Sequence, residues 1–145
     1  KPIQKPHPPI LVGGSGEKET LRIVAKYGDA CNVFGSPETV ARKMMILREH
    51  CARVGRDFGS ILKTKLSSVI IHKKKEDAEK KVPERFKNVP EERRREFAMY
   101  GTPDEVRRQV EAFRQAGIDY LIVNLEAERE LEALNLFADE VAKRC

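Results

Sequence analysis

Short apolar runs alternate along the chain with longer stretches of helical periodicity. Parallel strands that are covered by helices on both faces are apolar almost throughout, so these runs are typical of buried strands. They span residues 10–12, 30–34, 61–71 and 120–125. Strands that alternate with helices predict a parallel sheet with right-handed crossovers, and hence an α/β fold.

Between the predicted strands, apolar residues recur every three or four positions, which marks one face of an α-helix. The clearest stripe consists of Val40, Met44, Leu47, Cys51 and Val54. Further helices are expected at about 17–27, after residue 102 and at about 128–143. In the C-terminal helix, the side chains expected to turn inward are Leu131, Leu134, Phe137 and Val141.

Two segments of the same pattern predict where helices begin. Gly35-Ser36-Pro37-Glu38 and Gly101-Thr102-Pro103-Asp104 each place a capping hydroxyl before a proline that suits the first helical turn. Glu105 adds the carboxylate of a capping box with Thr102. Gly55 predicts a left-handed end for the helix that the first segment begins.

Residues 73–100 are highly charged and are broken by Pro83 and Pro90, which predicts a surface excursion of short helices. Its basic triplets, Lys73-Lys74-Lys75 and Arg93-Arg94-Arg95, are interleaved with glutamates and lack the aromatic residues on which bases stack. The net charge of the whole chain is only +5. These features favour a solvated helical surface, and we expect no nucleic-acid partner.

Composition sets the class of protein. With 145 residues, of which 40% are apolar and 35% charged, the chain suits one globular domain. No apolar run approaches the roughly 20 residues that cross a bilayer, so we expect no membrane segment. Cys31, Cys51 and Cys145 have neither zinc nor paired spacing, which favours reduced thiols in the cytoplasm. Abundant Lys, Arg and Glu without Trp hint at a thermophile.

Four parallel strands in one sheet leave two open edges, and apolar strands with open edges pair with something else. A (β/α)8 barrel removes the edges by closing on itself, and four strand–helix units are half of one. We therefore predict half of a (β/α)8 TIM barrel, completed by another half in the same protein or by a second copy of the chain. A small flavodoxin-like sheet is the alternative.

Several motifs resemble the bacterial luciferase-like monooxygenase superfamily, in particular its branch that uses the deazaflavin coenzyme F420. The first strand and its turn match the pattern P-I-x-I-G-G-x-G, and the next strand entry matches A-x-Y-A-D-x-x-N. Here Gly28 replaces the usual alanine, and Cys31 lies where tryptophan is frequent. The matching segments are residues 8–17, 20–22, 25–32, 50–57 and 101–120. The resemblance implies that residues 1–145 are the C-terminal half of the barrel, strands five to eight, with residues 73–100 as a variable excursion.

The turn Gly13-Gly14-Ser15-Gly16 is the best candidate site, because it joins the C-terminal end of a strand to the beginning of a helix. Backbone N–H groups and the helix dipole favour an anion there, and glycines let the backbone approach a phosphate closely. The resemblance implies that this turn holds the phosphate-bearing tail of the coenzyme. Tight turns also use glycine for geometry alone, so both interpretations stay open.

Asn32, on the second strand, is the other candidate cofactor ligand. Its amide suits either the coenzyme or a neighbouring backbone group. Ser36 follows in the next loop and is better explained as a helix cap. None of the three histidines has metal-ligand spacing, and His50 is expected at the surface. No metal site and no catalytic residue follow from the sequence.

The resemblance implies that the complete protein transfers hydride between F420, or alternatively FMN, and an organic small-molecule substrate. Lacking one side of the cofactor cleft, the isolated chain is expected to be inactive. A competing hypothesis is a stand-alone half-barrel that forms a homodimer and binds a phosphorylated ligand without catalysis. A third is a non-catalytic interaction domain with basic helices.

Overall fold

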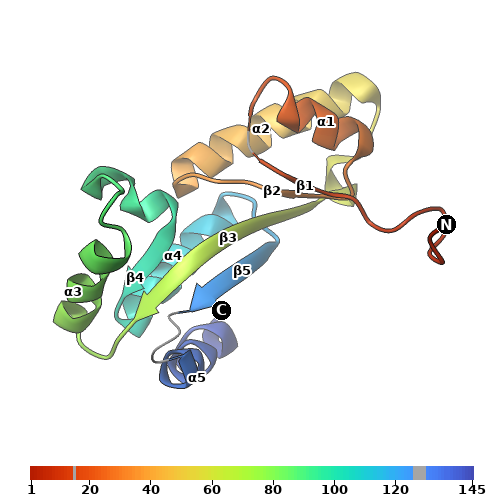
Figure 1. Cartoon of the computed structure of the whole chain (residues 1–145). Coiled ribbons are helices and arrows are strands. Elements are labelled where there is room, and N and C mark those ends of the chain that lie inside the picture. Colours follow the sequence, from red (N-terminus) through yellow and green to blue (C-terminus); the bar gives the residue numbers. More distant parts are fainter. Residues whose placement is uncertain (15, 126–129) are drawn as a thin grey trace.

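The computed structural model describes residues 1–14, 16–125 and 130–145, which form a parallel sheet with helices (Figure 1). The strands are β1 (Leu11–Gly13), β2 (Ala30–Asn32), β3 (Leu62–Ile71), β4 (Ala98–Gly101) and β5 (Tyr120–Leu125). The helices are α1 (Thr20–Tyr27), α2 (Pro37–Val54), α3 (Lys75–Arg85), α4 (Pro103–Gln115) and α5 (Glu130–Glu140). Helix α1 begins three residues later than the sequence predicts.

The long strand β3 organises the sheet. Its first residues pair with β2, its middle with β5 and its last four residues with β4, always in parallel. The N–H groups of Leu62 and Ser68 donate to the carbonyls of Asp29 and Phe97, so β2 and β4 lie along the same edge of β3. Without β4, the spatial order is β1-β2-β3-β5, which is the sequential order of consecutive barrel strands. The prediction of half a (β/α)8 barrel is confirmed.

Strand β4 was not predicted, because it lies at the end of the charged excursion. The excursion contains α3, a 3-10 segment at Glu91–Glu96 and then β4. Strand β4 is only four residues long, and it is recognised as a strand by its pairing with the C-terminal extension of β3, residues 68–71. Helix α3 packs against the same extension, where Ala78 and Val82 contact Ile70. The excursion therefore adds a strand and a helix beside the barrel strands.

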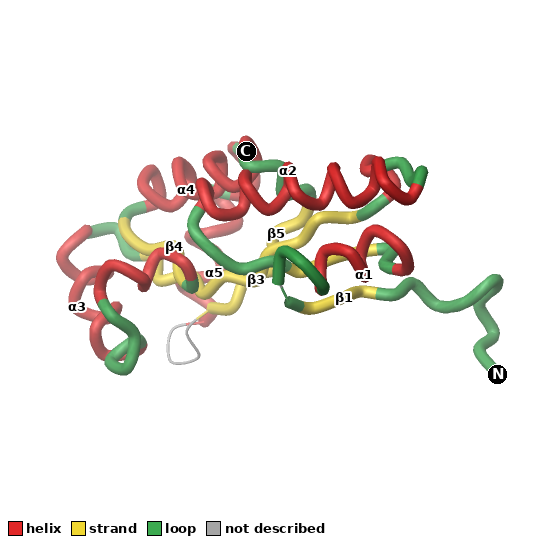
Figure 2. Tube along the Cα trace, turned by 90° about the horizontal axis from the view of Figure 1, so that it is seen from above, coloured by secondary structure: helices red, strands yellow, loops and turns green. Residues whose placement is uncertain are grey.

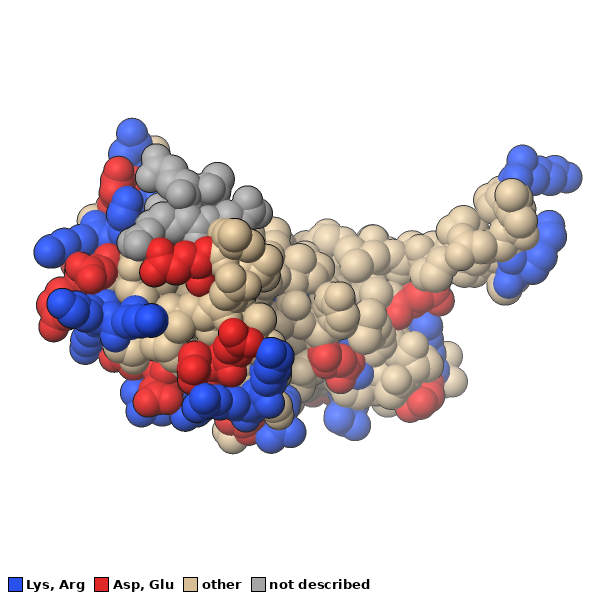
Figure 3. Space-filling view, turned by 90° about the horizontal axis from the view of Figure 1, so that it is seen from below, with Lys and Arg blue, Asp and Glu red and all other residues tan. Residues whose placement is uncertain are grey.

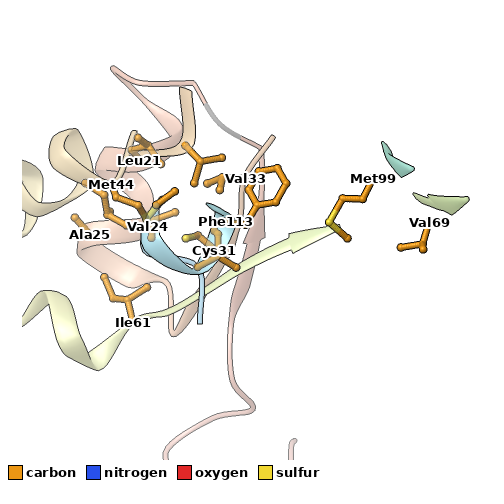
Figure 4. Close-up of a cluster of buried hydrophobic side chains, with 14 of the residues drawn as sticks. Leu21, Val24, Ala25, Cys31, Val33, Met44, Ile61, Val69, Met99 and Phe113 are labelled. Atoms are coloured by element: carbon orange, nitrogen blue, oxygen red, sulfur yellow. The ribbon is translucent and has the colours of Figure 1, made fainter. Parts of the chain in front are cut away.

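The helices α2 and α4 lie on one side of the sheet, behind it in Figure 1 and above it in Figure 2. Alternate residues of the strands turn toward this side and build the main core. Figure 4 shows part of this cluster. Its strand members are Cys31, Val69, Ile71 and Met99, and its helix members include Leu21, Val24, Met44, Leu47, Val106 and Phe113.

The opposite side of the sheet, here called the open face, corresponds to the side that faces the interior in a complete (β/α)8 barrel. Large apolar side chains on it remain exposed: Leu11 by 51%, Leu62 by 44%, Leu66 by 39% and Tyr120 by 59%. Within the described residues, the outer strands β1 and β5 each pair along one edge only. In Figure 3 the hollowed upper border is mostly tan, whereas charges gather over the helices and the α3 end. The sheet is therefore not closed by its own helices.

Both predicted helix starts form as expected. Ser36 caps α2 by accepting a hydrogen bond from the Thr39 N–H, and Thr102 and Glu105 form the complete capping box of α4. Gly55 ends α2 in the left-handed conformation, with φ at 69°. The glycine before each cap, Gly35 or Gly101, also has a positive φ, which explains why glycine precedes both hydroxyls.

Helix α5 corrects one expectation about the core. Leu131 and Leu134 are exposed by 72% and 44%, although both were predicted to turn inward. The stripe that contacts the core is instead Ala133, Leu136, Phe137 and, after the helix, Val141. The helix is rich in leucine around its circumference, so periodicity alone did not select the buried face.

Candidate functional site

The glycine turn follows β1 at the C-terminal end of the parallel strands, which is the end where (β/α)8 barrels carry their sites. Gly14 has φ at 121°, a conformation that favours glycine. Its N–H donates to the carbonyl of Asn32 at 3.1 Å, so this predicted site residue ties the turn to β2. Ser15 lies outside the described residues, Gly13 is the last residue of β1, and Gly16 precedes α1.

Beyond the turn lies a run of backbone N–H groups without an acceptor among the described residues. The Leu21 N–H donates to the carbonyl of Gly16 at 3.0 Å, whereas the N–H groups of residues 16–20 donate to no described residue. Helix α1 begins at Thr20, so these groups lie at the positive end of its dipole. The geometry suits an anion such as a phosphate, and these N–H groups lie slightly later in the chain than the glycines.

Helix α2 supports this segment from the side. Nε2 of His50 lies 2.9 Å from the carbonyl oxygen of Glu17, and Arg42 forms a 2.8 Å ion pair with the Glu17 carboxylate. His50 is half-buried, although the sequence indicated a surface position. Its ring therefore contributes to fixing the turn, a role that no local motif revealed.

Asn32 lies at the mouth, beside Gly14. Its Oδ1 accepts a hydrogen bond from the Leu66 N–H at 3.1 Å. Leu66 lies between the part of β3 that pairs with β2 and the part that pairs with β4, so the side-chain amide satisfies an N–H that the ladder leaves open. With Oδ1 committed, Nδ2 is the group left to donate, and it bonds to no described residue.

Strand register orders the open face into layers. Leu66 and Ile122 are direct neighbours on β3 and β5, and one layer closer to the mouth Ser68 and Asn124 are neighbours in the same way. Apolar side chains thus form a floor below a pair of neutral polar groups. Sequence analysis missed Ser68 and Asn124, because their shared face depends on the register of two strands that are distant in sequence.

Charged groups of the strands lie on the other side of the sheet. Lys63 pairs with Asp119 at 2.8 Å, and Lys65 extends over the ring of Phe113 on α4. The open face of β1, β2, β3 and β5 consists of neutral residues: Leu11, Gly13, Ala30, Asn32, Leu62, Thr64, Leu66, Ser68, Tyr120, Ile122 and Asn124. This face offers hydrogen bonds and apolar contact, and a catalytic acid or base is absent from it.

Members of both basic triplets of the excursion form contacts within the molecule. Lys75 lies 3.7 Å from Glu79 and 3.5 Å from Glu105, and Arg93 pairs with Glu96 at 3.1 Å. Arg95 donates to Gln109 and stacks on Tyr100. Among the described helices, none is long and apolar enough to span a membrane.

Solved structures share this fold. The F420-dependent tetrahydromethanopterin reductase from Methanopyrus kandleri superposes with a TM-score of 0.74 at 17% identity, covering 94% of this chain and 50% of that one. An F420-dependent secondary alcohol dehydrogenase gives 0.75 at 18% identity, covering 92% and 48%. EDTA monooxygenase from Chelativorans sp. BNC1 gives 0.70 at 20%, covering 99% and 45%. The chain therefore spans about half the length of these proteins.

The sequence itself matches a family model. Residues 1–87, which include the glycine turn, Asn32 and all of α2, match the model described as luciferase-like monooxygenase. This segment is more than half of the chain, and it agrees with the resemblance carried by the strand-end motifs. The chain belongs to the luciferase-like monooxygenase family.

Proposed function

We propose that this chain is the C-terminal half of an oxidoreductase that transfers hydride between F420, or alternatively FMN, and an organic substrate. The observation that carries the proposal is an open half-barrel whose first strand end is followed by N–H groups with no acceptor among the described residues. Two of the similar structures are F420-dependent enzymes by their descriptions, and a third, a Baeyer–Villiger monooxygenase, was solved with FMN. These are properties of those proteins, and they support the choice of coenzyme here.

The residues of the turn fit the tail of such a coenzyme. The N–H groups of residues 16–20 and the dipole of α1 would hold a phosphate, while Gly13, Gly14 and Gly16 keep side chains away from it. Ser15, in the same turn, is a further proposed contact to the coenzyme. Asn32 would donate from Nδ2 beside the turn. When bound, the coenzyme supplies the hydride chemistry, and the protein supplies orientation and exclusion of water.

In this proposal, the N-terminal half of the same protein completes the site. Residues 73–100 are an excursion of the C-terminal half. The similar structures, which are about twice as long, support this arrangement. A homodimer of half-barrels that binds a phosphorylated ligand is the second candidate, favoured by the two unpaired edges of β1 and β5. Free Cys31 and Cys51, both buried, fit a cytoplasmic protein.

The coenzyme turn is tested by Gly14→Val in the full-length protein. A β-branched residue at φ 121° forces the turn to change, and its Cβ contacts Thr20 at 3.4 Å. We expect binding of F420 and FMN to be abolished in fluorescence titrations. The matched control is Gly55→Val, which introduces a similar strain at φ 69° at the end of α2, with open space around its Cβ.

Gly55→Val is expected to lower the melting temperature while the affinity for the coenzyme stays unchanged. Equal affinity of the wild type and Gly14→Val would contradict the assignment of the turn. A wild-type protein that binds neither F420 nor FMN would contradict the proposed function as a whole.

A further inference from the structure

The polar pair Ser68 and Asn124 lies at the mouth end of the open face. On β3 and β5, the two residues are one and two strands away from Asn32, and two and three strands away from the glycine turn. The two residues are direct neighbours across β3 and β5. Ser68 is half-buried and Asn124 is exposed, and neither side chain hydrogen-bonds to any described residue. A hydroxyl and an amide thus stand side by side on the open face.

Among the described strand residues, the neighbours of this pair on the open face are apolar and neutral. Leu66 and Ile122 form the layer below it, and the next residue of β3 on the same face, Ile70, is covered by Ala78 and Val82 of α3. The lysines of β3 face the helices instead, as Lys65 does over Phe113. The surroundings therefore suit the edge of an uncharged, planar group lying on the apolar floor.

The distance between the Ser68–Asn124 pair and the glycine turn restricts which planar group could lie at this pair. Neighbouring strands lie about 4.8 Å apart, so β5 lies roughly 14 Å from β1 along the sheet. A coenzyme whose phosphate is held at the turn would place its ring over β3 and β5. The imide edge of a flavin or deazaflavin ring alternates acceptor, donor and acceptor, and a primary amide such as that of Asn124 provides both matching groups.

We propose that Ser68 and Asn124 form the subsite that hydrogen-bonds the imide edge of the coenzyme ring. The inference rests on the proposed function and adds ring recognition to the phosphate turn. Asn124 supplies the donor and acceptor, Ser68 supplies a second hydroxyl contact, and Leu66 and Ile122 carry the face of the ring. Different residues thus bind the phosphate end and the ring end of the coenzyme, so each end can be tested by its own substitution.

The test compares ligands with and without phosphate in the full-length protein. The pairs are FMN with riboflavin, and F420 with its unphosphorylated deazaflavin riboside. Asn124→Leu removes the hydrogen bonds, and Asn124→Asp keeps the size but cannot donate. Asn88→Leu, at an exposed position of the excursion, is the matched control. Circular dichroism and melting curves establish that each variant folds, as expected for exposed sites.

Each Asn124 variant is expected to weaken its phosphorylated and unphosphorylated ligands by the same factor. That factor is about 3- to 10-fold for Asn124→Asp, which loses one net hydrogen bond, and larger for Asn124→Leu, which loses two. Asn88→Leu should bind like the wild type, and Gly14→Val should weaken only the phosphorylated ligands. Wild-type affinity in the Asn124 variants, or a loss confined to FMN and F420, would overturn the subsite. Failure of the wild type to bind any of the four ligands would instead overturn the proposed function.

Discussion

Three lysines with little solvent exposure lie between the sheet and its helices. Lys43 donates to the Phe34 carbonyl at 2.6 Å, and Lys63 pairs with the Asp119 carboxylate. Lys65 is fully buried and bonds to the carbonyl of Glu96 at 3.0 Å. Burial lowers the pKa of Lys65 to about 8, although the Glu96 carboxylate opposes the shift.

This buried amine makes stability depend on pH. In the unfolded chain the pKa of Lys65 returns to about 10.5, so between pH 8 and pH 10.5 the unfolded state binds more protons than the folded state. The free energy of unfolding therefore gains up to about 3 kcal/mol from this group as pH rises through that window. Lys65→Met removes the gain.

The check is the melting temperature at pH 7 to 10 for the wild type, Lys65→Met and the exposed control Lys26→Met. We expect the melting temperature of the wild type to rise relative to that of Lys65→Met as pH rises. Lys26→Met should follow the wild type throughout. Parallel curves for all three proteins would show that Lys65 keeps an ordinary pKa.

At the scale of elements, the two helix starts show how a repeated motif fixes local structure. Ser36 accepts one backbone hydrogen bond at 3.3 Å, whereas Thr102 accepts one from Glu105 and its own N–H donates to the Glu105 carboxylate at 2.9 Å. A Cβ on Gly101 would collide with the Glu105 side chain. The capping box therefore requires glycine at position 101.

We expect Thr102→Ala to lower the free energy of unfolding by about 1 kcal/mol, because the box loses its side-chain acceptor. Ser36→Ala, the matched substitution at the other start, should cost less, because Thr39 closes no box there. Urea unfolding of both variants measures the difference. A larger loss for Ser36→Ala than for Thr102→Ala would be incompatible with a reciprocal cap.

At the scale of the whole molecule, the open face and the unpaired edges determine what the chain does alone. The residues Leu11, Leu62, Leu66 and Tyr120 are exposed on the open face, and in the proposed function the other half of the cofactor cleft lies in the N-terminal half of the protein. We expect the purified 145-residue chain to oxidise no reduced F420 or FMN. An absorbance assay with a range of organic acceptors measures this, and measurable turnover would disprove the requirement for a second half.

The same experiment separates the two partners. Addition of the N-terminal half should restore turnover and convert the sample to a one-to-one complex in size-exclusion chromatography with light scattering. The alternative of a homodimer predicts a stable pair of identical chains without any added segment. The added half would then leave this dimer unchanged.

Most of the fold was predictable, because its elements carry local signals. The strands at residues 30–34, 61–71 and 120–125, the caps at Ser36 and Thr102 and the C-cap at Gly55 all follow from nearby residues. Strand β4 was missed, since Ala98–Gly101 is too short for a pattern of its own. Leu131 and Leu134 were misplaced, because a helix that is apolar on several sides does not reveal which of them is buried.

The sequence by itself determined the alternation of strands and helices, the family and the glycine turn, since each is encoded in contiguous residues. Only the tertiary structure decided that Asn32 bonds to Leu66, that the N–H groups of residues 16–20 donate to no described residue and that Ser68 neighbours Asn124. These features depend on strand register and on hydrogen bonds between distant segments. Register is set by how the whole sheet packs, and no local pattern contains it.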